Sequence, residues 1–456
     1  MAERFDVVVI GGGIGGLVAA RTAAGQGKSV CLIEASERFG GALQGKELGG
    51  ITVDVGAEAF AIARPETRDL VGELGLSERI VQPRRSDSRL VVPNGIFPMP
   101  HALLGIPTNP LADDVVAIIG AHAAQAAAEL DAAPVPGSWD SEVTLGALIR
   151  ERLGDPIAEL IATPVVGGVH ALNPDLAEAE ALIPGICAAT RKHNGLAAAA
   201  AAMRAASGVP GAAVNGLRGG MSGLVTALVE DVRARGVDLR LGTAATAVTQ
   251  EGATWVTHVH GGDLHSDQVV VAVDAHHAAS LLTTIEQVHA PLSRLHVGDV
   301  VVFATVISHP LLDEDPLGSG ALIAPTTPNI RAKAITHASA KWQWIREAYG
   351  TGRHVVRLSY GRDGVITESL DDLPAIAHQD LELLLGTSLP EFEDVHLARW
   401  TGSLLHPRVG HRANVAELRS AIARFPGLAV APAGLAGNGL AGTISQAQAS
   451  IVEMRN

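Results

Sequence analysis

The stretch Phe5 to Glu34 reads FDVVVIGGGIGGLVAARTAAGQGKSVCLIE and predicts a strand, a glycine turn, a helix and a second strand. Asp6 to Ile10 is an apolar run too short for a helix and typical of a parallel strand covered on both faces. Ser29 to Ile33 predicts the second strand, which ends at Glu34. We therefore expect a doubly covered parallel sheet and an α/β fold.

The glycines of the turn, Gly11, Gly13 and Gly16, match the pattern G-x-G-x-x-G. The first allows the tight turn, the second lets a pyrophosphate approach the backbone, and the third lets the helix pack closely on the strand. The helix start at Ile14 and Gly15 presents unpaired N–H groups and a positive dipole end, which suit a diphosphate. This turn predicts a bound dinucleotide.

The end of the second strand indicates which ribose the dinucleotide carries. Glu34 follows the glycines by roughly 20 residues, where a carboxylate accepts hydrogen bonds from a free ribose. The next residue, Ala35, offers no cation for a 2′-phosphate. An unphosphorylated adenosine is therefore expected.

Size and charge exclude several classes of protein. The chain has 456 residues, 47% of them apolar and 18% charged, so we expect two or three compact domains. Aromatic residues make up 3% and the net charge is −14, which argues against nucleic acid or anionic lipid as the main partner.

Cysteine usage and apolar segments predict the compartment. The two cysteines, Cys31 and Cys187, form no disulfide framework and favour a reducing cytoplasm. The first strand begins without a leader sequence, so we expect no signal peptide. The Ala-rich runs are interrupted by polar residues, which predicts no transmembrane segment. We expect a cytoplasmic protein that is soluble or at most peripheral to the membrane.

Segments beyond Glu34 indicate a longer ligand than a plain nicotinamide dinucleotide. Gly40 and Gly41 would let a loop lie against such a ligand, and Arg38 could hydrogen-bond to it. The segment around Gly56 places small residues between polar ones, as expected where backbone lies close to a flat ring.

Several motifs together resemble the flavin amine-oxidase superfamily and, within it, the bacterial coproporphyrinogen and protoporphyrinogen oxidases. The resemblance covers most of the chain, and its motifs are the opening fingerprint, EASERFGG (34–41), DVGAEAF (54–60), RLVVPNGIFPMP (89–100), GIPT (105–108), GGVHA (167–171), GGMSGL (219–224), KW (341–342), VGH (409–411) and GLAGNGLAGTI (434–444). The glycine segments indicate only FAD, whereas the segments at 89–100 and 105–108 point to the porphyrinogen branch. Two departures are Ala42, where relatives often have a basic residue, and Pro432, where a glycine is expected.

The resemblance implies a Rossmann-like FAD-binding domain in three pieces, 1–82, 209–280 and 401–456. An α+β substrate-binding domain (83–110 and 281–400) and a helical region (111–208) are inserted in it. The two Ala-rich runs, at 111–133 and 196–206, are expected to be packed helices. The segment 224–235 predicts a helix, and 237–241, 244–250, 254–260 and 268–273 predict strands.

The resemblance also implies the residues that contact FAD. The expected contacts are Gly11, Gly13, Ile14, Gly15, Gly16, Glu34, Ala35, Arg38, Gly40, Gly41, Ala42, Gly56, Ala57, Glu58, Val248, Gly437, Gly442, Thr443 and Ile444. No metal is expected, because His258, His260 and His265 lack a carboxylate or cysteine to complete a ligand set and are more simply hairpin residues.

The implied reaction is the aromatisation of coproporphyrinogen III to coproporphyrin III in haem biosynthesis, with O2 as acceptor and H2O2 as product. FAD would perform the redox step, so few catalytic side chains are required. A downstream enzyme of the haem pathway is a possible partner. The substrate carries carboxylate arms, for which Arg89 is the first candidate, with Gly168 and Lys341 as further substrate contacts and Arg331 and Lys333 of second rank.

Other activities remain open at this stage. Protoporphyrinogen IX oxidase is the nearest alternative, and an amine oxidase, a carotenoid desaturase or a non-enzymatic prenyl-protein escort would share the fold. The sequence identifies no general base for the pyrrole protons. Glu58 and His170 are candidates, although a structural carboxylate and a helix-surface histidine are the simpler interpretations.

Overall fold

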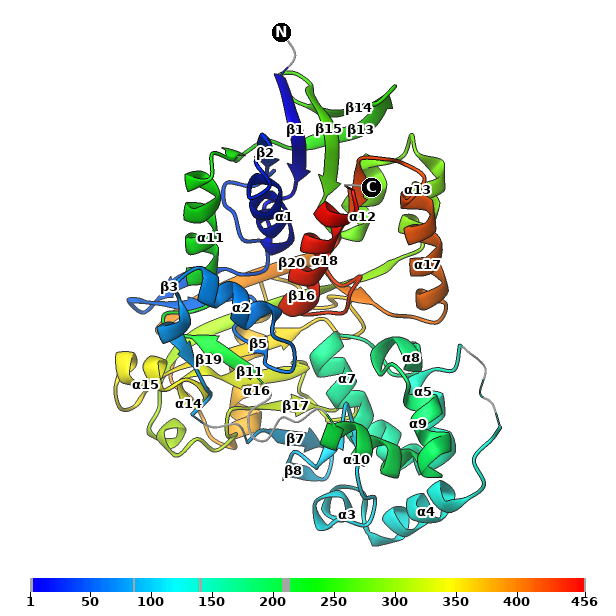
Figure 1. The fold of residues 1–456 in the computed structure, drawn as a ribbon. Coiled ribbons are helices and arrows are strands. Elements are labelled where there is room, and N and C mark those ends of the chain that lie inside the picture. Colours follow the sequence, from blue (N-terminus) through cyan, green and yellow to red (C-terminus); the bar gives the residue numbers. More distant parts are fainter. Residues whose placement is uncertain (1–2, 85–86, 138, 140–141, 207–213, 455–456) are drawn as a thin grey trace.

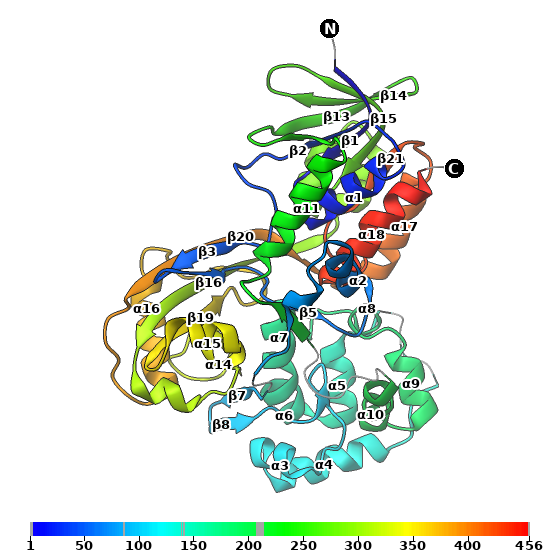
Figure 2. The ribbon, with the colours of Figure 1, turned by 60° about the vertical axis from the view of Figure 1, so that its left-hand side comes forward.

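The computed structural model describes residues 3–84, 87–137, 139, 142–206 and 214–454. Three bodies are visible in Figures 1 and 2: a domain that carries both ends of the chain, a second domain built on a long curved sheet, and a cluster of helices beside that sheet. Within the described residues, no helix is both long and apolar enough to cross a lipid bilayer.

The first sheet has the order β12-β2-β1-β15-β14-β13, with β21 beside β15. Its strands are β1 (Glu3–Ile10), β2 (Val30–Ile33), β12 (Asp238–Arg240), β13 (Ala245–Glu251), β14 (Thr254–Val259), β15 (Leu264–Val271) and β21 (Leu428–Val430). The pairs β12–β2, β2–β1, β1–β15 and β15–β21 are parallel, whereas β13 and β14 are antiparallel additions. This is the expected α/β fold, assembled from three separate parts of the chain.

Helices cover both faces of the first sheet. The helices are α1 (Ile14–Ala24), α11 (Ser222–Ala234) and α18 (Leu440–Glu453) on one face, and α12 (Ala275–Leu281), α13 (Glu286–Ser293) and α17 (His411–Ile422) on the other. Alternate residues of β1 point to opposite faces: Val7 and Val9 join the first layer, and Val8 and Ile10 join the second. Every one of these four side chains is buried, which explains the uninterrupted apolar run in the sequence.

The second sheet has the order β20-β16-β19-β18-β17-β7-β8. Its strands are β7 (Arg89–Val92), β8 (Gly95–Pro98), β16 (His296–Ser308), β17 (Gly320–Ile323), β18 (Ala334–His337), β19 (Arg353–Tyr360) and β20 (Asp394–His406). Helix α16 (Leu373–Leu385) packs on one face, while α14 (Ala338–Lys341) and α15 (Gln343–Tyr349) pack on the other.

The helical cluster lies against the β7 end of the second sheet (Figure 2). Its helices are α3 (Asp113–Ile119), α4 (Ala121–Ala132), α5 (Leu145–Leu153), α6 (Asp155–Ile157), α7 (Thr163–His170), α8 (Ala179–Leu182), α9 (Ile186–His193) and α10 (Leu196–Ala206), with a π-helical turn at Ala158–Ala162. Both Ala-rich runs are helical as expected, and Gly120 at φ +83° divides the first into α3 and α4.

Short elements join these bodies. They are β3 (Gly45–Leu48), β4 (Ile51–Asp54), β5 (Phe60–Ala61), α2 (Glu66–Glu73), a 3-10 turn (Ser77–Arg79), β6 (Ile80–Val81), β9 (Ala102–Leu103), β10 (Ile106–Pro107), β11 (Val214–Leu217) and a second 3-10 turn (Pro310–Glu314). Strand β11 lies between β5 and β6, so the chain returns to its first piece directly after the helical cluster.

Two of the expected domain limits fall inside elements of the structure. The hydrophobic core under the first sheet continues through α13 to Leu295, beyond the expected limit at 280. The expected limit at 400 lies within β20, which pairs with β16 as far as His406. The limit between 208 and 209 lies outside the described residues.

Candidate functional site

The glycine turn is held in its shape by close backbone contacts. Gly11 adopts φ +105°, and a Cβ on Gly16 would lie 1.8 Å from the Gly11 carbonyl oxygen, so no side chain fits at Gly16. Gly13 is different, because a Cβ there would meet nothing closer than the Cα of Gly41 at 4.0 Å. The turn therefore keeps an open face at Gly13, where α1 begins.

Glu34 is oriented by three hydrogen bonds. Its Oε2 accepts the Gly12 N–H at 2.6 Å, and its Oε1 accepts the Ser36 N–H at 2.9 Å and the Ser36 hydroxyl at 2.7 Å. These bonds fix the carboxylate beside the glycine turn, where the sequence predicts the ribose contact. Ala35 follows it directly and leaves this position without a cation.

The second glycine segment lies beside the first. Gly13 and Gly40 form a parallel bridge, and the Gly12 carbonyl accepts the Gly40 N–H at 2.8 Å. The Arg38 guanidinium donates to the Gly41 carbonyl at 2.8 Å and lies 5.8 Å from the centroid of the Trp400 ring. Burial lowers the pKa of Arg38 from its ordinary value, which indicates that this side chain already belongs to the packed loop.

The C-terminal glycines complete the group. A Cβ on Gly15 would lie 3.4 Å from the methyl group of Thr443 at the start of α18. Gly437 adopts φ +98°, and a Cβ on it would meet no atom of the described residues within 4 Å. A Cβ on Gly442 would lie 2.7 Å from the Gly437 carbonyl oxygen. Ile444 is fully buried in the same core as α1. The amino ends of α1 and α18 thus lie side by side.

The segment Gly56 to Glu58 lies against the same loop. The Ala57 N–H donates to the Ala42 carbonyl at 3.0 Å, and a Cβ on Gly56 would lie 2.0 Å from that oxygen. Ala42 contributes its backbone here, so the contact does not depend on its side chain. Trp400 donates from Nε1 to the Val55 carbonyl at 3.1 Å and covers Gly56.

These segments suit an extended dinucleotide. The oriented carboxylate of Glu34 lies beside the glycine turn, and the open face of Gly13 lies beside Gly41. The amino ends of two helices and the open face of Gly437 continue this surface. Residues 14–446 of this chain match the family of flavin containing amine oxidoreductases. The chain belongs to this family. Family membership confirms the expected FAD cofactor.

Full-length relatives define the branch of the family. A coproporphyrinogen III oxidase of Mycobacterium tuberculosis (strain ATCC 25618 / H37Rv) is 32% identical over 468 residues, which cover 98% of this chain and 97% of the relative. A coproporphyrinogen III oxidase of Bacillus subtilis (strain 168) is 26% identical, and the match covers 98% of this chain and 97% of the relative. The resemblance to bacterial porphyrinogen oxidases is confirmed.

Solved structures agree with this placement. A protein from Exiguobacterium sp. 255-15, described as a putative protoporphyrinogen oxidase, superimposes with a TM-score of 0.85 at 26% identity, covering 100% of both chains. A cyclohexylamine oxidase from Brevibacterium oxydans IH-35A gives a TM-score of 0.71 at 17% identity and covers 99% and 98%, which shows the shared fold alone.

Val248, one of the expected FAD contacts, lies in the antiparallel part of the first sheet. Val248 in β13 pairs with Thr257, which pairs with Leu264, which in turn pairs with Glu3 at the amino end of β1. Its side chain is fully buried in the core, and its carbonyl accepts the Thr284 hydroxyl at 3.2 Å. The contact of Val248 with FAD stays a prediction.

Glu58 holds three basic or polar side chains together. Its carboxylate lies 2.6 Å from Lys341 Nζ and 2.7 Å from Arg357 Nη1, and Trp342 Nε1 is at 3.5 Å. Burial alone would raise the pKa of Glu58, but the charges of Lys341 and Arg357 outweigh it and lower the pKa to about 2. Such a group is a poor proton acceptor, so Glu58 is a structural carboxylate here rather than a general base.

The expected substrate contacts have different environments. Arg89 in β7 is 26% exposed and lies 3.6 Å from Asp87, so its guanidinium is held only loosely. Lys341 is neutralised by Glu58. A Cβ on Gly168 would lie 2.5 Å from the Leu322 side chain, so Gly168 lets α7 pack closely on β17. Of the three, Arg89 keeps the character expected of a carboxylate-binding group.

Two other basic groups are Lys333, which directly precedes β18, and His170, which ends α7. Lys333 is buried, donates to the Gly361 carbonyl at 3.2 Å, and has its pKa lowered to about 8 by burial. His170 is the last residue of α7 and is half-buried. Its Nδ1 has no hydrogen-bond partner among the described residues, and burial lowers its pKa to about 4. His170 is therefore a neutral imidazole near pH 7.

The structure adds residues that sequence reasoning missed. Arg357 pairs with Glu58 and also donates to the Gly56 carbonyl at 2.6 Å. Asp54 accepts the Met221 N–H at 2.8 Å at the start of α11 and is buried, which raises its pKa to about 6. A buried carboxylate such as that of Glu58 requires charged or hydrogen-bonding partners. This requirement was the only feature that could have indicated a partner such as Arg357 from the sequence.

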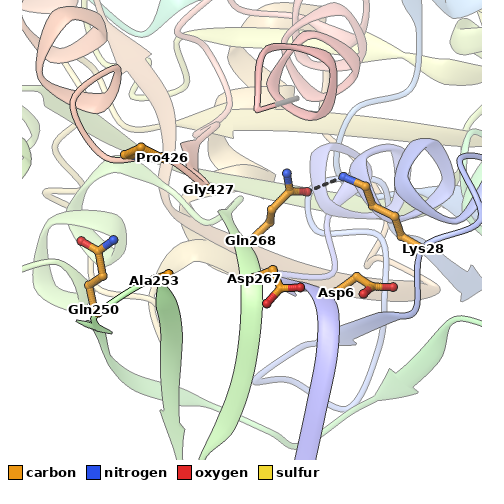
Figure 3. Close-up of a pocket in the computed structure, with 9 residues that line it drawn as sticks. Asp6, Lys28, Gln250, Ala253, Asp267, Gln268, Pro426 and Gly427 are labelled. Atoms are coloured by element: carbon orange, nitrogen blue, oxygen red, sulfur yellow. Dashed lines mark hydrogen bonds between the residues drawn. The ribbon is translucent and has the colours of Figure 1, made fainter. Parts of the chain in front are cut away.

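A cavity of about 680 Å³ lies at the opposite end of the first sheet. Asp6, Lys28 and Asp267 line it at the amino end of β1, and Lys28 Nζ donates to Gln268 Oε1 at 2.5 Å (Figure 3). Phosphate-binding turns lie at the carboxyl ends of parallel strands, so this cavity is not part of the dinucleotide site.

Local contacts account for His258, one of the three hairpin histidines. His258 lies 2.9 Å from the Asp263 carboxylate through Nδ1 and 3.0 Å from the Thr249 hydroxyl through Nε2. Among residues whose placement is described, no group of three or more metal-binding side chains comes together.

Proposed function

We propose that this protein is an oxidase of coproporphyrinogen III, forming coproporphyrin III in haem biosynthesis with O2 as acceptor and H2O2 as product. The observation that carries the proposal is the 32% identity to a coproporphyrinogen III oxidase over 98% of this chain. The oriented Glu34 and the open glycine faces at Gly13 and Gly437 support it, because they fit the FAD that such an oxidase requires.

When bound, FAD supplies the oxidising centre for the methylene bridges of the macrocycle. The chain's own residues bind and orient both molecules. In this proposal Glu34 takes the ribose, the amino ends of α1 and α18 take the diphosphate, and the backbone from Gly40 to Ala42 lies along the ring system.

We further propose that Arg89 binds a carboxylate arm of the substrate. Among the described residues, the one ion pair of its guanidinium is a 3.6 Å contact with Asp87, and the side chain is partly exposed, so a carboxylate can approach it. Lys333 is a second candidate on the same sheet, since its amine has a single carbonyl partner and is deeply buried. Coproporphyrinogen has four carboxylates, which favours a site with several such cations.

An anaerobic titration tests the substrate. The FAD-loaded protein is mixed with coproporphyrinogen III in the absence of air, and loss of the yellow flavin absorbance shows reduction. Admission of air should then restore the absorbance and give coproporphyrin fluorescence with peroxide. A flavin that stays oxidised with coproporphyrinogen III but is reduced by protoporphyrinogen IX would overturn the assignment in favour of the alternative oxidase.

A further inference from the structure

A second cavity, of about 490 Å³, lies at the amino end of α17. Its walls come from the start of β16, the end of β20 and the first turns of α17, all visible at one side of Figure 1. We call it the α17 cavity; it is lined by Arg294, Leu295, His296, His406, Arg408, Val409, Gly410, His411, Ala413, Asn414 and Glu417.

The α17 cavity contains polar groups that the fold leaves without partners. His406 is 1% exposed, and neither of its ring nitrogens has a hydrogen-bond partner. The buried Nε of Arg408 likewise has none, and within the described chain its guanidinium forms no ion pair. Buried polar atoms in native proteins are normally satisfied, so unsatisfied donors that line an open cavity indicate a ligand.

The local charge in the α17 cavity is positive although the whole chain carries −14. Its one lining carboxylate, Glu417, is already paired with Arg294, which also donates from Nε to Asn414 at 2.9 Å. Arg408 therefore remains uncompensated. The first turn of α17 contains no acidic residue of its own, but its Arg412 N–H donates to the buried Glu178 carboxylate at 3.2 Å, so this helix end is already compensated and the unpaired charge is that of Arg408.

Burial lowers the pKa of two imidazoles that line the cavity. Burial lowers the pKa of His411 to about 4, with His296 adding to the effect. Burial and the nearby Arg408 lower the pKa of His406 to about 4 as well. An anion in the cavity would offset the repulsion that these groups share, whereas a cation would add to it.

We propose that the α17 cavity binds the carboxylate of an organic acid. Arg408 offers a planar fork that matches a carboxylate, and the unpartnered ring nitrogens of His406 offer a further hydrogen bond. The aliphatic surfaces of Leu295, Val409 and Ala413 suit a ligand with a carbon body rather than a bare inorganic ion. A free dicarboxylic acid and a carboxylate arm of a porphyrin share this chemistry.

Calorimetric titration of the FAD-loaded protein tests the proposal with three probes: glutarate, inorganic phosphate and coproporphyrin III. Glutarate should bind saturably, and Arg408→Gln should weaken it at least tenfold. Arg412→Gln is the matched control, because that arginine lies in the first turn of α17, four residues after Arg408, does not line the cavity, and is 56% exposed with only a 4.0 Å contact to Glu178 among the described residues. His411→Gln provides a second cavity variant and should also weaken glutarate.

Each outcome decides the proposal. If coproporphyrin III displaces glutarate, the proposal is supported and the natural ligand is a carboxylate arm of a porphyrin. If glutarate binds but coproporphyrin III does not displace it, the proposal is supported and the natural ligand is a free organic acid. Absence of saturable glutarate binding, equal loss in Arg408→Gln and Arg412→Gln, or tighter binding of phosphate than of glutarate would overturn it. The readout is binding, so the result does not depend on which porphyrinogen the enzyme oxidises.

Discussion

The Glu58 carboxylate lies 2.6 Å from the Lys341 ammonium, although 283 residues separate them in the chain. Arg357 from β19 contacts the other carboxylate oxygen at 2.7 Å. The pair therefore joins the segment beside the cofactor loop to the second domain. Its charges stabilise each other in a partly buried place, which gives Glu58 a role in holding the two domains at the site.

Replacement of Glu58 by Gln should destabilise the fold. The change leaves Lys341 and Arg357 close together without their shared anion, and breaking a buried pair in this way costs about 3 kcal/mol. Chemical denaturation at pH 7 measures the loss in the free energy of unfolding. Arg68→Gln, on a side chain that is 66% exposed, is the control and should change it by less than about 0.5 kcal/mol.

The same carboxylate predicts an acid-dependent loss of stability. The folded pKa of Glu58, about 2, lies below its ordinary value of 4.5, so its contribution is fully present above pH 4.5. That contribution should fall progressively as the pH drops from 4.5 toward 2. Denaturation curves of Glu58→Gln across this range should show a smaller pH dependence than the parent protein; parallel curves would contradict the prediction.

Asp54 should show the opposite sign. Its folded pKa is raised to about 6 from 3.8, so the folded state holds a proton that the unfolded state has lost between these values. Stability should therefore decrease as the pH rises from 3.8 to 6 and then level off. Asp54→Asn should abolish this slope, since Asn can still accept a hydrogen bond from the amino end of α11 but does not titrate.

Gly13→Ala should fold without its flavin. The nearest atom to the new methyl group is 4.0 Å away, so the chain itself tolerates it, but the methyl group would occupy the surface expected to face the diphosphate. We expect unchanged circular dichroism and a much reduced ratio of absorbance at 450 nm to that at 280 nm. Gly72→Ala in α2, whose Cβ would lie 3.4 Å from the Ser77 hydroxyl, should keep the flavin.

Arg89 and Lys341 should respond differently to replacement by Ala. Loss of Arg89 should raise KM for coproporphyrinogen III at least tenfold with a smaller change in kcat, because it removes uniform binding of a carboxylate arm. Lys341→Ala should instead lower the free energy of unfolding, since it removes the partner of Glu58. Steady-state kinetics and denaturation of both variants separate the roles; an unchanged KM in Arg89→Ala would remove Arg89 from the site.

The segments predicted to hold the cofactor could be recognised because each is local in sequence. The turn at Gly11 to Gly16, the carboxylate of Glu34 and the pair Gly40-Gly41 each require a particular backbone geometry that only certain residues allow. The structure brings these segments together as expected. The position of Val248, by contrast, depends on strand register rather than on local preference, so its contact with FAD stays a prediction.

The sequence by itself determined the βαβ opening, the FAD cofactor and the porphyrinogen branch of the family, because short-range geometry and the motif set specify them. Only the tertiary structure decided that Glu58 is neutralised by Lys341 and Arg357, that Gly168 serves the packing of α7 on β17, and that His406 and Arg408 line a separate cavity. The physical reason is that charge pairing and burial arise from contacts between residues hundreds of positions apart, which no local pattern records.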